Sequence, residues 1–140
     1  MQRKGSAVWM GGLKDGKGTV STASGVLKDT QYSFATRFEN GAGTNPEELI
    51  GAAHAGCFSM AFSAASEKAG FKVDHVATEA TVTLEMTGGP AITAVHLTMS
   101  AKVPGISQQQ FEEIANGAKA GCPVSKVLNA KITLDAKLES

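Results

Sequence analysis

The sequence has only two cysteines, Cys57 and Cys122, and they do not form a CxxC motif. The missing motif argues against a general thiol–disulfide oxidoreductase. A chain of 140 residues buries enough surface to form a core without disulfide staples. We therefore expect one domain spanning residues 1–140, in which the two thiols serve chemistry rather than stability.

The sequence also lacks an excess of charge of either sign. Thirteen basic side chains balance thirteen acidic ones, and no basic stripe with interleaved aromatic residues occurs. Such a stripe is the usual mark of a nucleic-acid-binding surface. The composition therefore argues against nucleic acid as the main partner.

Uninterrupted hydrophobic runs are missing as well. Residues 1–12 have no apolar segment of the kind found in signal peptides. The longest apolar stretch, residues 46–70, is interrupted by Glu47, Glu48, His54, Ser59, Ser63 and Ser66. We expect neither a membrane span nor export, but a cytoplasmic location, where standing disulfides are rare.

The pattern along the chain predicts an α+β fold with the element order βββ–α–ββ–αα–β. Strands are expected at 5–10, 18–27, 32–38, 73–86, 91–103 and 130–138, and helices at 46–68, at 107–121 and from Pro123 onward. The helix at 46–68 has an N-cap at Asn45, Pro46 at its first position and Gly70 after its end. Since small and apolar residues cover nearly all its sides, we expect a central buried helix.

The two cysteines lie in contexts that suit reactive thiols. Cys57 lies within the predicted buried helix, and Cys122 directly precedes Pro123 at a predicted helix start, where exposed N–H groups favour a thiolate. Each cysteine could instead be incidental, Cys57 as a small buried hydrophobe. A structural bridge between them is a further alternative and would stabilise the fold by about 4 kcal/mol. A redox pair is the leading hypothesis.

Three other side chains could influence Cys57. His54 precedes it by one helical turn and could polarise the thiol, ligate a metal or only pack. A free thiol has a pKa of about 8.5 and needs a cation or donor to ionise at neutral pH. Arg37, at the end of the predicted third strand, could be that cation or an ordinary solvated charge. Glu47 could hold its guanidinium or simply complement the helix dipole.

Two other site types have weak support. The stretch at 11–18 nearly spells a phosphate-binding loop, but Gly18 replaces the final Ser or Thr and a strand follows. A zinc site would need ligands from His54, Cys57, His75, His96 and Cys122, whose spacing matches no compact ligand pattern.

The runs 44–61 and 119–128, together with 18–27 and 36–55, resemble the osmotically inducible protein C (OsmC) family and its close kin, the organic hydroperoxide resistance (Ohr) proteins. The match covers nearly the whole chain, and His54 places it nearer the OsmC branch than the Ohr branch. Gly56 departs from the alanine usual in the family, a change that affects packing more than chemistry.

This resemblance implies a thiol peroxidase that reduces organic hydroperoxides, and hydrogen peroxide to some degree, in oxidative and osmotic stress defence. Cys57 would be the peroxidatic thiol, Cys122 the resolving thiol, and Arg37 with Glu47 the activating pair. No cofactor or metal is implied, and a lipoylated protein would be the dithiol reductant. The implied fold is an intertwined homodimer with curved antiparallel sheets around central helices. Phe58, Met60 and Phe62 could line the substrate site or belong to the core.

Two further classes remain open from the sequence. One is a redox-inert module that binds a small ligand or serves as a structural stress protein. The other is a metal-binding protein. Rapid formation of a disulfide between Cys57 and Cys122 on addition of peroxide would argue against the first, and metal analysis would decide the second.

Overall fold

A computed structural model describes all 140 residues of the chain. The residues fall into two compact units, Met1–Leu49 and Ile50–Ser140, which are described separately. The α+β class is confirmed, and so is the predicted order apart from one additional short helix. The elements are β1 (Gly5–Met10), β2 (Lys17–Thr22), β3 (Thr30–Tyr32), α1 (Phe34–Phe38), α2 (Pro46–Lys68), β4 (His75–Glu85), β5 (Ala91–Lys102), α3 (Gln108–Gly121), α4 (Pro123–Val127) and β6 (Lys131–Leu138).

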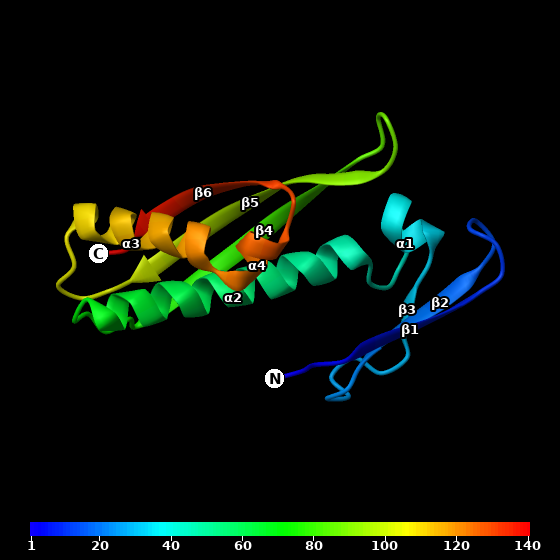
Figure 1. The fold of residues 1–140 in the computed structure, drawn as a ribbon, viewed down its shortest axis with the longest axis horizontal. Coiled ribbons are helices and arrows are strands. Elements are labelled where there is room, and N and C mark those ends of the chain that lie inside the picture. Colours follow the sequence, from blue (N-terminus) through cyan, green and yellow to red (C-terminus); the bar gives the residue numbers. More distant parts are fainter. The chain divides into compact units, whose positions relative to one another are not determined.

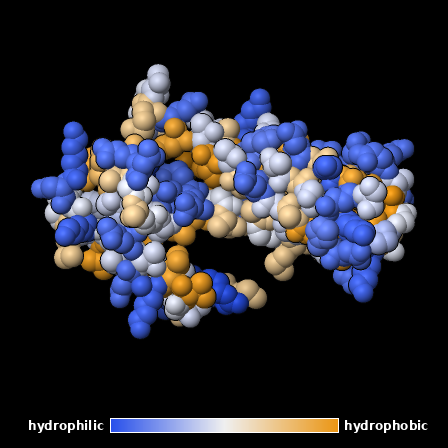
Figure 2. All heavy atoms as spheres, turned by 180° about the vertical axis from the view of Figure 1, so that it is seen from behind, coloured by the Kyte–Doolittle hydropathy of each residue, from blue (hydrophilic) through white to orange (hydrophobic).

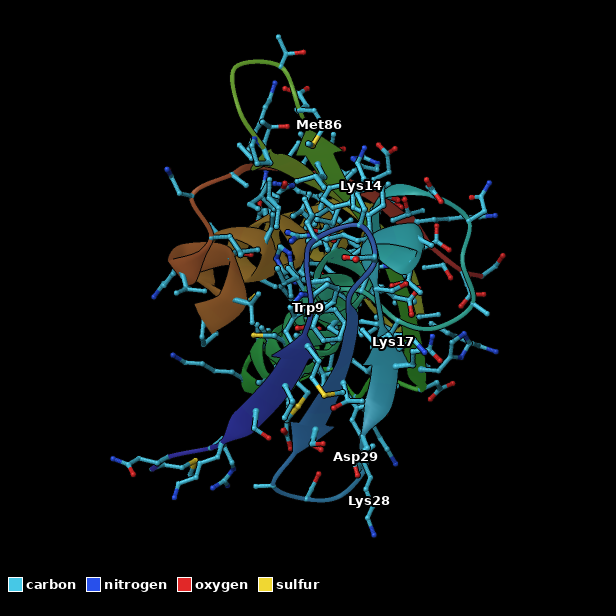
Figure 3. All side chains as sticks on the ribbon, turned by 90° about the vertical axis from the view of Figure 1, so that its right-hand side faces the viewer. Trp9, Lys14, Lys17, Lys28, Asp29 and Met86 are labelled. Carbon is cyan, nitrogen blue, oxygen red and sulfur yellow. The ribbon has the colours of Figure 1, made fainter.

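The first unit holds an antiparallel sheet in the order β1-β2-β3. Lys14 lies at the β1–β2 turn, and Lys28 and Asp29 lie in the loop at the opposite end of β2 (Figure 3). Trp9 and Tyr32 flank Gly18 across the sheet, and their ring centroids are 5.4 Å apart. A Cβ at Gly18 would come within 2.5 Å of both rings, so glycine permits this aromatic pair.

The predicted strand at 32–38 is wrong beyond Tyr32. Ser33 and Thr36 form a reciprocal capping box that starts the helix α1. The Thr36 N–H donates to the Ser33 hydroxyl, and the Ser33 N–H donates to the Thr36 hydroxyl. These local side-chain hydrogen bonds compete with the sheet ladder and end the strand. Arg37 therefore lies on a helix rather than at a strand end.

The predicted start and end of α2 are confirmed. The Asn45 side chain accepts a hydrogen bond from the Glu48 N–H at 2.7 Å, and Pro46 is the first helical residue. The Glu48 carboxylate accepts from the Thr44 hydroxyl. At the other end Gly70 adopts a φ of +90°, which glycine tolerates best.

The second unit holds a sheet in the order β4-β5-β6, with α2 and α3 packed against one face (Figure 1). The pair β4 and β5 is antiparallel, but β5 and β6 run parallel, which corrects the expectation of purely antiparallel sheets. The connection through α3 and α4 is long enough for a parallel crossover. The core consists of Phe58, Phe62, Val95, Leu97, Met99, Ala101, Val103, Phe111, Ala115, Ala118 and Cys122.

Helix α2 is buried on one side of the single chain rather than all round. His54, Phe58, Phe62 and Ser66 recur every fourth residue and are fully buried, whereas Met60 is 76% exposed. The outer side carries small residues and Met60, so the prediction of a fully buried helix is wrong for the chain alone. By length and composition α2 could cross a membrane, a test that the core helix of a water-soluble protein also passes.

Replacing Phe111 should test this core directly. Phe111 is fully buried on α3 and packs edge-on against Phe62, with centroids 5.6 Å apart. We expect Phe111→Ala to lower the free energy of unfolding by about 3–5 kcal/mol in urea denaturation, because it leaves a cavity. The exposed Gln109→Ala on the same helix should change it by less than about 0.5 kcal/mol. Equal effects of the two substitutions would contradict the assigned core.

Candidate active site

Cys57 lies in the middle of α2, beside the helix's buried stripe. Its side chain is half-buried and packs against the core cluster that contains Cys122. The N–H of Val124, in the first turn of α4, donates a hydrogen bond to the Cys57 sulfur. The thiol is thus held by the core on one side and retains partial access to solvent.

Cys122 occupies the junction between α3 and α4 and is fully buried. It ends α3 and serves as the N-cap of α4, as its position before Pro123 predicts. The N–H and the hydroxyl of Ser125 each lie 3.4 Å from its sulfur. A sulfur at such a cap receives hydrogen bonds that favour its ionised form.

The structure brings the two thiols together, although they are far apart in the sequence. The Cys57 thiol lies within hydrogen-bonding reach of the Cys122 sulfur, and both cysteines are reduced. The pair has the proximity that reversible disulfide formation requires.

The two thiols differ in how readily they ionise. Burial raises the pKa of Cys57, and its hydrogen bond to Cys122 raises it further. Burial also raises the pKa of Cys122, but the hydrogen bonds from Ser125, Cys57 and Val124 outweigh it, so this pKa lies below the ordinary value. Within the second unit, Cys122 is thus the more acidic thiol, as its position at a helix start predicts, and the thiolate of Cys57 still needs a nearby cation.

His54 contacts neither cysteine directly through a hydrogen bond. Its Nε2 lies 2.7 Å from the Ser125 hydroxyl, and its ring is fully buried. Burial lowers the pKa of His54 and thus favours the neutral imidazole. Sequence reasoning missed Ser125, because its proximity to His54 arises only from the packing of α4 on α2.

Arg37 and Glu47 meet within the first unit. Nε and one terminal nitrogen of Arg37 both donate to Oε1 of Glu47, at 3.1 and 2.8 Å. The Arg37 side chain is 38% exposed, while the other carboxylate oxygen of Glu47 is buried without a hydrogen-bond partner. The guanidinium is therefore held in a fixed orientation with one terminal nitrogen uncommitted to this carboxylate.

An open apolar pocket adjoins this ion pair. It has a volume of about 270 Å³ and is lined by Trp9, Leu13, Tyr32, Ser33, Phe34, Arg37 and Phe38. Of the three residues predicted either to line the substrate site or to belong to the core, Phe58 and Phe62 are core, and Met60 lies on the exposed side of α2. The sequence did not indicate that aromatic residues line a pocket beside Arg37, because residues 32–38 were predicted as a strand and α1 was not expected.

The five residues considered for zinc do not form one cluster. No group of three or more His, Cys, Asp and Glu side chains has the arrangement of a metal site. His75 pairs with Glu139, and His96 contacts Thr133 and Asp135 on the sheet. This arrangement gives no support to the metal-binding alternative.

Known proteins are similar to this chain in sequence. Peroxiredoxin OsmC of Escherichia coli (strain K12) is 55% identical over 141 residues, covering 100% of this chain and 99% of the relative. Organic hydroperoxide resistance protein OhrB of Bacillus subtilis (strain 168) is 26% identical over 87% of this chain and 88% of its own.

Solved structures share the fold. The crystal structure of OhrB from Bacillus subtilis superposes with a TM-score of 0.68 at 25% identity and covers 96% of this chain and 98% of its own. An OsmC-like protein from Mycoplasma pneumoniae gives a TM-score of 0.76 at 14% identity, with 100% and 99% coverage. The family model described as OsmC-like protein matches residues 39–137. With its fold, its two facing cysteines and these relatives in agreement, the chain belongs to the OsmC-like protein family.

Proposed function

We propose that this protein is a cysteine-based peroxidase that reduces hydroperoxides in defence against peroxide stress. The observation that carries the proposal is the close approach of the Cys57 and Cys122 thiols. The relatives support it, since they are named as a peroxiredoxin and as organic hydroperoxide resistance proteins. Two free, facing thiols fit a cycle in which a disulfide forms and is reduced again.

Cys57 is the peroxidatic thiol in this proposal, because it is partly accessible whereas Cys122 is fully buried. The Cys57 thiolate attacks one oxygen of the hydroperoxide, the O–O bond breaks, and an alcohol leaves after taking up a proton. Cys57 is oxidised to sulfenic acid as the peroxide is reduced.

Arg37 and Glu47 supply the activation that Cys57 lacks within its own unit. Burial and the neighbouring Cys122 raise the pKa of Cys57, so a cation is needed to favour the thiolate. We assign this role to Arg37, whose guanidinium Glu47 orients. The same positive charge would stabilise the oxygen that departs from the peroxide.

Organic hydroperoxides are the proposed substrates. The apolar pocket beside Arg37 offers aromatic side chains to an alkyl group, while the guanidinium suits the polar peroxide end.

Cys122 then condenses with the sulfenic acid, and a dithiol carried on a lipoylated protein reduces the disulfide. We place the protein in the cytoplasm, where reducing conditions return such a disulfide to free thiols.

Substituting each cysteine tests this assignment. We expect Cys57→Ser to abolish peroxide reduction, because the attacking sulfur is gone. We expect Cys122→Ser to consume one peroxide per subunit without sustained turnover with a dithiol. The measurement is consumption of an alkyl hydroperoxide and of hydrogen peroxide, with dihydrolipoamide and thioredoxin compared as donors. Normal turnover by the Cys57→Ser protein would rule out the proposed function.

Removing the guanidinium tests the activating role. We expect Arg37→Ala to reduce kcat/KM for an alkyl hydroperoxide by about a hundredfold, the cost of losing one fixed charge-stabilising donor. It should also raise the pKa of Cys57 measured by alkylation against pH. The control is Arg3→Ala, since Arg3 is exposed and bonds only the neighbouring Gln2 carbonyl. An unchanged Cys57 pKa in Arg37→Ala would remove Arg37 from this role.

We also propose that residues 1–140 form a single OsmC-like domain and that the protein is a homodimer. Hydrophobic atoms reach the surface of the single chain among hydrophilic ones (Figure 2). Strand β1 is exposed along its whole length, and Val8, Met10, Leu13 and Met60 are each more than half exposed. Apolar side chains on this scale favour cover by a second copy.

The mass of the protein in analytical ultracentrifugation tests the proposed homodimer. We expect the protein to sediment at twice its chain mass of 14.4 kDa. Met60→Glu should weaken the dimer, because it places a charge on the exposed apolar side of α2. Gln109→Glu, a change on the exposed polar side of α3, should leave it intact. A monomer at micromolar concentration would contradict the proposal.

A further inference from the structure

A chain of hydrogen bonds links α2 to the Cys122 sulfur. His54 Nε2 lies 2.7 Å from the Ser125 hydroxyl, and that hydroxyl lies 3.4 Å from Cys122 Sγ. The three side chains belong to the second unit, and both His54 and Cys122 are fully buried. The peroxidase chemistry described above makes no use of His54 or of the Ser125 hydroxyl.

The tautomer of His54 decides which atom donates in each of these hydrogen bonds. A neutral imidazole carries one proton, either on Nε2 or on Nδ1. Nδ1 is buried and has no hydrogen-bond partner. An orphaned buried N–H is more costly than an orphaned acceptor, so the proton resides on Nε2. Nε2–H then donates to Ser125, whose own hydroxyl proton is free to point at the sulfur.

His54 cannot easily act as a proton acceptor in this chain. Its burial opposes a positive charge on the ring and lowers its pKa. Accepting a proton would leave a buried imidazolium without a counter-charge among its hydrogen-bond partners. His54 therefore fixes the orientation of the Ser125 hydroxyl and does not shuttle a proton.

We propose that His54 and Ser125 are positioning residues of the resolving step: His54 holds the Ser125 hydroxyl as a donor to Cys122 and so stabilises the thiolate that attacks oxidised Cys57. The inference rests on the proposed function, in which Cys122 is the resolving thiol. The Ser125 N–H and the Cys57 thiol also donate to this sulfur, and Ser125 extends the set with its side chain.

The step balances with groups already named. Cys122 loses its proton, its thiolate attacks the sulfur of the Cys57 sulfenic acid, and an S–S bond forms as the S–O bond breaks. The departing hydroxide takes up the proton and leaves as water. Both sulfurs share the oxidising equivalent that the peroxide delivered to Cys57, so no further oxidant is required.

Titration of the Cys122 thiolate tests the hydrogen bonds from His54 to Ser125 and from Ser125 to Cys122 separately from peroxidase activity. The titration uses ultraviolet absorbance in a Cys57→Ser background, which keeps a hydroxyl donor near Cys122. We expect Ser125→Ala and His54→Phe to move the ionisation of Cys122 to higher pH and to lower its thiolate fraction at neutral pH several-fold. Ser125→Thr and His54→Gln, which retain a donor, should restore it. Ser66→Ala, which removes a buried α2 hydroxyl without a partner, should have no effect.

Disulfide formation after one equivalent of alkyl hydroperoxide gives the kinetic readout with both cysteines present. We expect Ser125→Ala to slow it about tenfold at neutral pH, the effect of losing one hydrogen bond to a charged group. The rate should recover at high pH, and peroxide consumption in the first turnover should be unchanged. A merely structural defect would slow the reaction at every pH.

Two results would overturn the inference. One is the same Cys122 titration in Ser125→Ala as in the parent protein. The other needs no substitution: nitrogen chemical shifts of His54 in the native protein that place the proton on Nδ1. If Ser125→Ala shifts the Cys122 titration but the Cys122→Ser protein turns over normally, the hydrogen bonds from His54 and Ser125 do stabilise the Cys122 thiolate. The resolving role of Cys122 in the proposed function is then refuted.

Discussion

The site depends on the packing of α4 against α2, which brings two thiols from distant parts of the chain into contact. In the first turn of α4, the Val124 N–H favours the ionised form of both sulfurs, and the Ser125 N–H lies 3.4 Å from the Cys122 sulfur. Phe58 of α2 and Phe111 of α3 belong to the same buried core, which holds these two helices together. Because both sulfurs share one short helix as a source of donors, any movement of α4 affects both thiols at once.

The two thiols are prepared for different tasks by this shared environment. Burial acts on both, but Cys122 has the additional hydroxyl of Ser125 and the cap geometry. Cys57 has one backbone donor and a neighbouring sulfur that disfavours its charge. Neither of these donors is a cation, and the Arg37 guanidinium, which Glu47 orients, lies in the first unit.

Local signals allowed much of the fold to be predicted from the sequence, and tertiary packing accounts for the rest. Asn45, Pro46 and Gly70 gave the limits of α2, because caps are encoded by adjacent residues. The alternation at 32–38 was misleading, since the capping box of Ser33 and Thr36 outweighs it. The resemblance pointed to the cysteines and the Arg37–Glu47 pair. No sequence spacing could place Ser125 beside His54, 71 positions away.

The double position of Cys122, as the end of one helix and the cap of the next, couples redox state to backbone order. In the thiolate form its sulfur is a strong acceptor for the N–H of Ser125. A disulfide sulfur carries no such charge and accepts more weakly, so a bridge at Cys122 would weaken the cap of a helix only five residues long. The order of this short helix would then follow the chemical state of one sulfur atom.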